Sequence, residues 1–201
     1  MEPCDARLRG MAATPTSSVP SILSDRLELV WLTPEFIEAV LDGRRTDAAT
    51  LIGASLPSGW PGRGGRERRI LRVRLKEMQD APESAAWLLR AVVRRDDREF
   101  VGRVNFHNPP DEFGVAELGY TVFEPHRRQG YASEAATAMM AWARAEHGIH
   151  HFRLSISPTN LPSLALAAKL GFARVGSRID EIDGEEHVFE LGVPGPAATH
   201  N

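Results

Sequence analysis

VFEPHRRQGYAS, residues 122–133, is the stretch that decides the fold. A predicted strand ends at its first residue, a loop with two arginines and a glycine follows, and a long helix begins directly after Gly130. The N–H groups at the start of a helix point outward without partners and attract anions. Gly130 and Ala132 leave the backbone open to close approach, and Arg127 and Arg128 add positive charge. The stretch predicts a pyrophosphate site, although a basic loop with an incidental glycine explains the spacing alone almost as well.

The sequence lacks the motifs of the common nucleotide and zinc sites. It contains neither G-x-x-x-x-G-K-[ST] nor G-x-G-x-x-G, so neither a P-loop nor a Rossmann nucleotide site is supported. His147, His150 and His151 cluster, but no cysteine completes a zinc set, and a helix end followed by a strand explains them better. We therefore expect no metal.

Apolar periodicity on both sides of this stretch predicts further elements. In chain order they are a strand over 24–31, a helix from Thr33-Pro34, a basic helix over 66–78, strands over 87–95, 99–106 and 115–123, a helix over 129–147, a strand over 152–156, a helix over 162–171, and strands over 172–182 and 185–191 joined by Asp183-Gly184. A meander followed by a crossover predicts an α/β fold with a mixed, mostly antiparallel central sheet flanked by helices on both faces.

Composition narrows the class of protein. The 201 residues carry 24 Lys and Arg against 27 Asp and Glu, a net charge of −3, which argues against a nucleic-acid-binding protein. No apolar run approaches the roughly 20 residues of a membrane span, and the N-terminus lacks a signal-peptide pattern. The single cysteine, Cys4, excludes an intramolecular disulfide and favours a cytoplasmic location.

The two ends of the chain are polar and aperiodic. We expect a disordered N-terminal tail over residues 1–22, one domain over 23–193 and a disordered C-terminal tail over 194–201. Met1 and Met11 both remain possible start positions.

Three short motifs occur in order along the chain: ELGYTV at 117–122, RRQGYA at 127–132, and NLPS at 160–163 followed by KLGF at 169–172. The second resembles the [QR]-x-x-G-x-[GA] signature of the GNAT superfamily of acetyl-CoA-dependent N-acetyltransferases. The first and third resemble the E-[IL]-G-Y and N-x-x-S…K-L-G-F motifs of its branch that includes ribosomal-protein N-terminal acetyltransferases. The resemblance extends over residues 23–193 and implies the GNAT-like acyl-CoA N-acyltransferase fold.

The resemblance implies acetyl-CoA as the cosubstrate and assigns its contacts. Tyr120, Thr121 and Val122 would lie along the pantetheine arm, which Asn160 would also bind. Arg127 would face the phosphates of the adenine half. The pyrophosphate would lie on the loop and first helical turn, formed by Arg128, Gln129, Gly130, Tyr131, Ala132 and Ser133.

The resemblance also implies two catalytic candidates. An amine is mostly protonated at pH 7, so a base must remove a proton before the amine attacks the thioester. Glu117 is the candidate base, although a carboxylate exposed on the sheet or paired with Arg103 or Arg153 is an equally good interpretation. Ser163 is the candidate contact to the leaving thiolate, although a serine here also suits helix capping.

The expected activity is N-acetylation of a primary amine, either a protein N-terminus or a small molecule. A homodimer is a further expectation from the resemblance. Ala167 stands where many family members carry a tyrosine acid, which leaves a non-catalytic acyl-CoA-binding or sensor protein as the alternative. The only thiol lies in the N-terminal tail, so direct transfer is favoured over an acyl-enzyme. The segment 42–86 and the last hairpin would select the acceptor. Within the segment 42–86, the basic run at 63–69 suits either a solvated helix face or contact with an acidic acceptor. Trp60 suits either the core or the entrance of the acceptor site.

Overall fold

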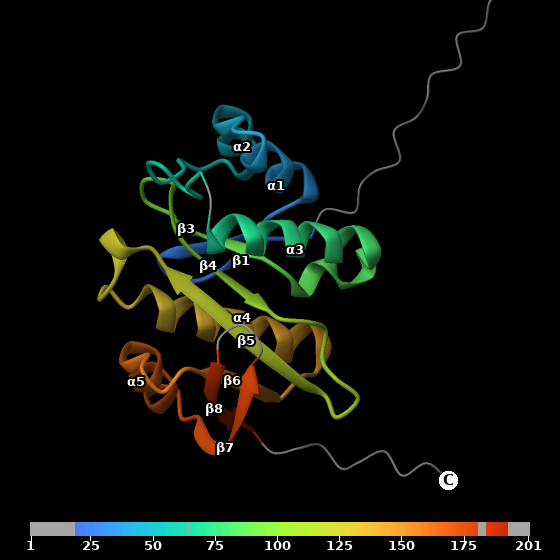
Figure 1. Ribbon diagram of the computed structural model, residues 1–201, viewed down its shortest axis with the longest axis vertical. Helices are drawn as coiled ribbons and strands as arrows, with labels where there is room; N and C mark the ends of the chain where they lie inside the picture. Colours follow the sequence, from blue (N-terminus) through green and yellow to red (C-terminus); the bar gives the residue numbers. More distant parts are fainter. Residues whose placement is uncertain (1–18, 64, 181–183, 193–201) are drawn as a thin grey trace, which may run out of the picture.

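The computed structural model describes residues 19–63, 65–180 and 184–192, in which an eight-stranded sheet carries helices on both faces (Figure 1). In the order in which they lie across the sheet, the strands are β1 (Ile22–Leu23), β2 (Leu27–Trp31), β3 (Arg90–Arg94), β4 (Glu99–Phe106), β5 (Val115–Val122), β6 (His151–Ile156), β8 (Gly184–Leu191) and β7 (Ala173–Asp180). Neighbouring strands are antiparallel except β5 and β6, which are parallel. The predicted mixed, mostly antiparallel α/β sheet is confirmed.

The parallel strands β5 and β6 separate along most of their length. Only Val115 to Glu117 pair with His151 to Arg153, whereas β5 stays paired with β4 as far as Val122. From Leu118 onward, β5 has a paired strand on one side only. Its other side therefore offers backbone N–H and C=O groups along a gap in the middle of the sheet.

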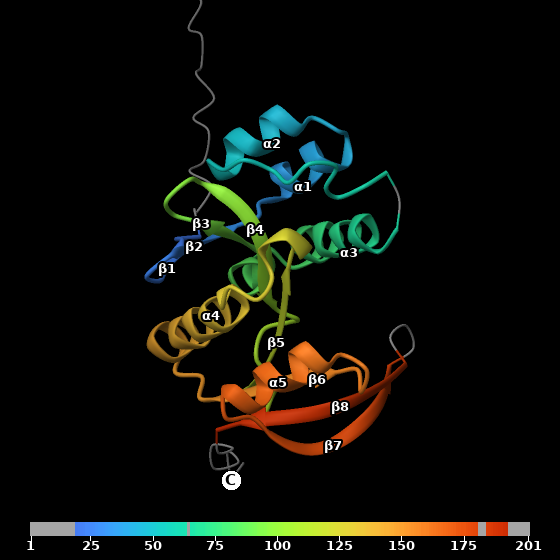
Figure 2. The ribbon, with the colours of Figure 1, turned by 90° about the vertical axis from the view of Figure 1, so that its left-hand side faces the viewer.

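Helices cover the two faces of the sheet. They are α1 (Pro34–Leu41), α2 (Arg45–Ile52), α3 (Arg66–Asp80), α4 (Tyr131–His147) and α5 (Leu161–Lys169), with short 3-10 helices η1 (Pro82–Trp87) and η2 (Glu124–His126). Figure 2 shows α3 and α4 on opposite sides of β4 and β5. Helices α4 and α5 pack on one buried cluster that includes Val104, Leu118 and Phe152, and α1 to α3 pack on a second that includes Val93 and Phe100.

Local sequence signals account for several element boundaries. Thr33 caps α1 as predicted, since its hydroxyl accepts a hydrogen bond from Phe36 N at 3.2 Å. The basic helix is confirmed and extends to Asp80. Gly148 ends α4 in the left-handed conformation, also as predicted.

Helix α2 and the start of β3 differ from the predicted elements. Helix α2 was not expected, because only Ala48 and Ile52 of its eight residues are buried and so leave little apolar periodicity. The strand predicted from Trp87 begins instead at Arg90, because Trp87 ends η1 and its ring packs against Phe106.

The predicted final hairpin is present as β7 and β8, but Asp183 of its turn lies outside the described residues. The two tails also fall largely outside them. At the inner boundary of the N-terminal tail, Ile22 and Leu23 pair with β2 as β1. Trp60, for which the sequence left two interpretations, is 8% exposed and packs against Phe36, Phe100 and Phe123 in the core.

Candidate functional site

A cavity of about 640 Å³ lies where β5 and the loop that follows it meet α5 and the first turn of α4. It gathers most of the residues predicted from the sequence: Tyr120, Thr121, Val122, Arg127, Arg128, Gly130, Tyr131, Ala132, Ser133, Asn160 and Ser163. Two predicted residues, Gln129 and Glu117, do not line it. The cavity follows the unpaired side of β5 to the first turn of α4, so its lining suits an extended ligand that ends in an anion.

The loop before α4 exposes the start of the helix. Gly130 adopts a left-handed conformation with φ of 85°, and no side chain caps the helix there. The first hydrogen bond within this turn runs from Glu134 N to Gly130 O at 3.1 Å. The N–H groups of the residues between these two point out of the helix toward the cavity wall. Arg128 also has a positive φ, 63°, which is uncommon for a residue with a side chain and marks a loop held in one shape.

An ion pair that the motifs did not reveal holds this loop in place. The Glu134 carboxylate accepts hydrogen bonds from Arg26 N and Ser24 Oγ, both at 2.8 Å, and lies 2.7 Å from Arg26 Nη2. Arg26 Nη1 in turn donates to Gln129 O at 3.1 Å. Glu134 lies in the first turn of α4, where the helix dipole stabilises a negative charge. This position near the helix start is the sequence feature that could have indicated its role.

The Glu134 contacts predict a pH-dependent stability. Burial alone would raise the pKa of Glu134, but the hydrogen bonds from Arg26 and Ser24 outweigh it, and the pKa is lowered from 4.5. A carboxyl with a lowered pKa stabilises the fold above its unfolded pKa and loses that contribution as pH falls through the folded pKa. Glu134→Gln should therefore cost about 1–2 kcal/mol at pH 7, with the deficit narrowing as pH falls below about 4.5.

Urea unfolding of wild type and variant between pH 7 and pH 3.5 measures this difference. The exposed Glu112→Gln serves as the control and should leave stability unchanged at every pH. A Glu134→Gln deficit that stays constant down to pH 3.5 would show that charge on this carboxyl is not what holds the loop.

A second cavity, of about 690 Å³, opens on the α3 side of the sheet. Five residues line both cavities, so the two meet at the gap between β5 and β6: Tyr120, Thr121, Arg127, Asn160 and Ser163. The second cavity is polar, because its lining includes His107 and the strand residues Arg103, Asn105, Ser155 and Glu186.

Charged residues of α3 form one wall of the second cavity. Arg66, Glu67 and Arg74 line it, and Glu67 Oε1 accepts a hydrogen bond from Arg103 Nη2 at 2.9 Å. Arg103 is only 8% exposed, and its Nε has no hydrogen-bond partner among the described residues. This partly buried ion pair joins residues 36 positions apart and was not predicted. It also takes Arg103 away from Glu117.

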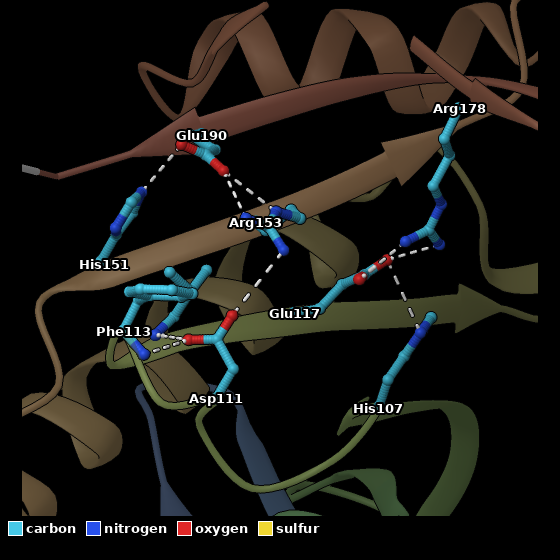
Figure 3. A network of polar contacts seen from close by, with 9 residues as sticks. His107, Asp111, Phe113, Glu117, His151, Arg153, Arg178 and Glu190 are labelled. Atoms are coloured by element: carbon cyan, nitrogen blue, oxygen red, sulfur yellow. Dashed lines mark hydrogen bonds and ion pairs between the residues drawn. The ribbon is translucent and has the colours of Figure 1, made fainter. Parts of the chain in front are cut away.

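Glu117 lies beside the second cavity without lining it. Arg178 of β7 holds both of its carboxylate oxygens, with Nη1 to Oε2 at 3.1 Å and Nη2 to Oε1 at 2.9 Å (Figure 3). Neither partner suggested by the sequence is correct, since Arg153 pairs with Glu190 at 2.7 Å instead. The remaining neighbour of Glu117 is His107, whose Nδ1 lies 3.8 Å from Oε1.

The hydroxyls near the gap are placed by the start of α5. Asn160 caps this helix, since its Oδ1 accepts a hydrogen bond from Ser163 N at 3.3 Å, so the capping role suggested for Ser163 belongs to Asn160. Ser163 faces both cavities. Burial raises the pKa of the Tyr120 hydroxyl, which therefore stays a proton donor at neutral pH.

Residues 19–63, 65–180 and 184–192 contain neither a candidate metal site nor a candidate membrane span. Within these ranges no group of three or more His, Cys, Asp or Glu side chains is arranged to hold a metal ion. Nor does any helix there have the length and apolar character needed to cross a bilayer. The clustered histidines have structural contacts: His147 packs against Trp87, and His151 Nε2 lies 3.0 Å from Glu190.

Comparison with known proteins agrees with this geometry. The family model described as acetyltransferase (GNAT) domain matches residues 26–173. The uncharacterized N-acetyltransferase YjdG of Bacillus subtilis is 36% identical over 81 residues, 40% of this chain and 48% of that protein. The ribosomal protein uS5-alanine N-acetyltransferase of Escherichia coli is 32% identical over 99 residues, 47% of this chain and 51% of that protein. The chain thus spans about half the length of these curated relatives.

Solved structures share the fold. The microcin C7 self-immunity acetyltransferase MccE, solved in complex with acetyl-CoA and AMP, matches 85% of this chain and 94% of its own with a TM-score of 0.59. The sequence identity is 15%, so this likeness concerns the fold alone.

Proposed function

Because this chain belongs to the GNAT acetyltransferase family, we propose that it transfers an acetyl group from acetyl-CoA to a primary amine by direct attack. The acceptor is either a protein N-terminus, as the uS5-alanine N-acetyltransferase name indicates for that relative, or a small-molecule amine. A reducing cytoplasm suits a chain whose only cysteine is Cys4. The homodimer stays a prediction that size-exclusion chromatography would test.

One observation carries this proposal: two cavities reach the gap between β5 and β6 from opposite sides of the sheet. A transferase must bring two substrates together at one point and keep water away from it. The first cavity ends at an open helix start and suits the diphosphate of acetyl-CoA. The second is polar and suits the amine. Their shared residues mark where the thioester and the amine would meet.

The residues of the first cavity fit acetyl-CoA. The unpaired side of β5 at Tyr120, Thr121 and Val122 offers backbone groups to the amides of the pantetheine arm. The N–H groups after Gly130, together with Arg128, suit the pyrophosphate. Arg127, whose Nε donates to Val122 O at 3.1 Å, would face the remaining phosphates, and Asn160 would reach the pantetheine from α5.

The chemistry requires two proton movements. The amine must lose a proton to attack, and we assign Glu117 to the group of residues that draws this proton away. The departing thiolate must gain a proton, and the Ser163 hydroxyl faces both cavities at the gap where the sulfur would leave. Ala167, at the position where many family members carry a tyrosine acid, is fully buried and has no hydroxyl. Tyr120, which lines the same cavities as Ser163, supplies a second hydroxyl.

Thiol release from acetyl-CoA over a panel of amines and peptide N-termini tests the proposal. We expect turnover with at least one acceptor, and Glu117→Gln should slow it without weakening acetyl-CoA binding. Tight acetyl-CoA binding with no turnover on any acceptor would instead support a non-catalytic acyl-CoA-binding protein. Absence of both binding and turnover would remove the proposed function altogether.

A further inference from the structure

His107 is a titratable side chain of the second cavity that no motif singles out. It follows β4 directly, it is half-buried, and it lines the cavity on the α3 side. Its backbone is fixed on both sides: His107 N donates to Glu117 O at 2.8 Å, and His107 O accepts from Arg74 Nη1 at 2.8 Å.

The imidazole lies where the gap in the sheet begins. A Cβ placed on Gly119 would come within 2.6 Å of His107 Nε2, so the ring packs directly over Gly119. Gly119 is the second residue of β5 beyond the end of its pairing with β6. The Nε2 edge of His107 thus stands at the closed end of the gap, while Glu117 lines neither cavity.

Charged groups from three elements surround this ring. Desolvation by the surrounding protein is the main cause that lowers the pKa of His107, and Arg74 of α3 and Arg178 of β7 add to it. Glu117 of β5 and Glu77 of α3 oppose the shift without reversing it. The lowered pKa favours the neutral imidazole, which carries a lone pair that can accept a proton.

We propose that His107 accepts the proton of the acceptor amine, and that Glu117 acts through His107 as a positioning residue. This assignment rests on the proposed acetyltransferase function. The Nδ1 edge faces Glu117 at 3.8 Å, beyond hydrogen-bond length but close enough for the carboxylate to favour a proton on that edge. Figure 3 shows this contact between His107 and Glu117, which leaves the Nε2 lone pair to accept a proton.

The proton balance follows from the overall reaction. An acceptor R–NH₃⁺ first gives one proton to His107 Nε2, which later releases it to solvent. The amine nitrogen then forms a bond to the thioester carbonyl carbon, and the carbon–sulfur bond breaks. The nitrogen loses a second proton, and the departing sulfur gains one. The products are the N-acetyl amine, the free thiol of coenzyme A and one proton in solution.

Three variants, assayed on the intact chain with the best acceptor of the panel, test this assignment. His107→Gln should lower kcat at least about 100-fold and remove the acid limb of the pH–kcat profile. His107→Ala should regain activity on addition of imidazole, which a purely structural role would not allow. Glu117→Gln should keep the acid limb but move it to lower pH, because loss of the carboxylate charge lowers the pKa of His107.

The exposed His150→Gln is the matched control and should leave kcat and its pH profile unchanged. The inference is overturned if His107→Gln keeps the wild-type pH–kcat profile, or if Glu117→Gln removes the acid limb. It is also overturned if His107→Ala has the melting temperature of the wild type but imidazole does not restore its activity. In each of these cases the wild type still turns over, which separates failure of this inference from failure of the proposed function.

Discussion

Gly130→Glu is expected to abolish the stabilisation that acetyl-CoA gives to the protein. A ligand at about 100 times its Kd stabilises the folded state by about 2.7 kcal/mol. For a domain of this size that corresponds to a rise in Tm of about 5–10 °C. The substitution removes the rise for two reasons. It places a negative charge where the phosphates would lie, and it forces a side chain onto a backbone with φ of 85°.

A thermal shift titration with acetyl-CoA measures this effect, and Gly43→Glu is its control. Gly43 has nearly the same backbone conformation, with φ of 80°, and a Cβ there meets nothing within 4 Å. It lies between α1 and α2, away from both cavities. Gly43→Glu should lower the starting Tm but keep the full shift. An undiminished shift in Gly130→Glu would mean that the pyrophosphate does not bind at this helix start.

Gly102→Ala is expected to destabilise the protein by about 1–3 kcal/mol and to slow acetyl transfer. Gly102 of β4 pairs with Val122 of β5. A Cβ at Gly102 would lie 3.0 Å from Val122 Cα and deep inside contact distance of the Thr121 carbonyl oxygen. Both obstacles are backbone atoms, so no side chain can turn aside, and β5 must move away from β4. Movement of β5 displaces the edge along which the pantetheine arm would bind.

Urea unfolding and steady-state kinetics on Gly102→Ala measure the two effects. Gly176→Ala is a matched control, since Gly176 also lies in a strand and a Cβ there meets nothing within 4 Å. It should change stability by no more than about 0.5 kcal/mol and leave KM for acetyl-CoA unaltered. A Gly102→Ala protein as stable and active as wild type would show that β4 and β5 separate at little cost.

The fold and the cosubstrate-binding residues were predicted from two different kinds of sequence pattern. The meander and the crossover follow from apolar periodicity, which reports burial residue by residue. The cavity residues around Gly130 follow from three short motifs, each confined to a few neighbouring residues. Helix α2 was not predicted because few of its residues are buried, so its apolar periodicity is weak. The 3-10 helix η1 was not predicted because its last residue, Trp87, is apolar and was assigned to the following strand.

The contacts among the residues of the second cavity were not predictable from the sequence. The segment 42–86 contributes Glu67 to a partly buried ion pair with Arg103, and no local sequence pattern near either residue predicts the other as its partner. Glu117 showed the same difficulty. The two suggested partners, Arg103 and Arg153, lie on the strands beside β5, whereas the actual partner, Arg178, lies 61 residues away on β7.

The sequence by itself determined the meander, the crossover, the mixed sheet and the family resemblance, and it placed an open helix start after Gly130. These properties depend on short-range periodicity and on motifs of a few residues, so they are visible in one dimension. Only the tertiary structure decided which charged groups face each other: Arg26 with Glu134, Glu67 with Arg103, and Arg178 with Glu117 beside His107. Ion pairs depend on distance in space, and β-sheet topology brings together residues whose separation along the chain has no period.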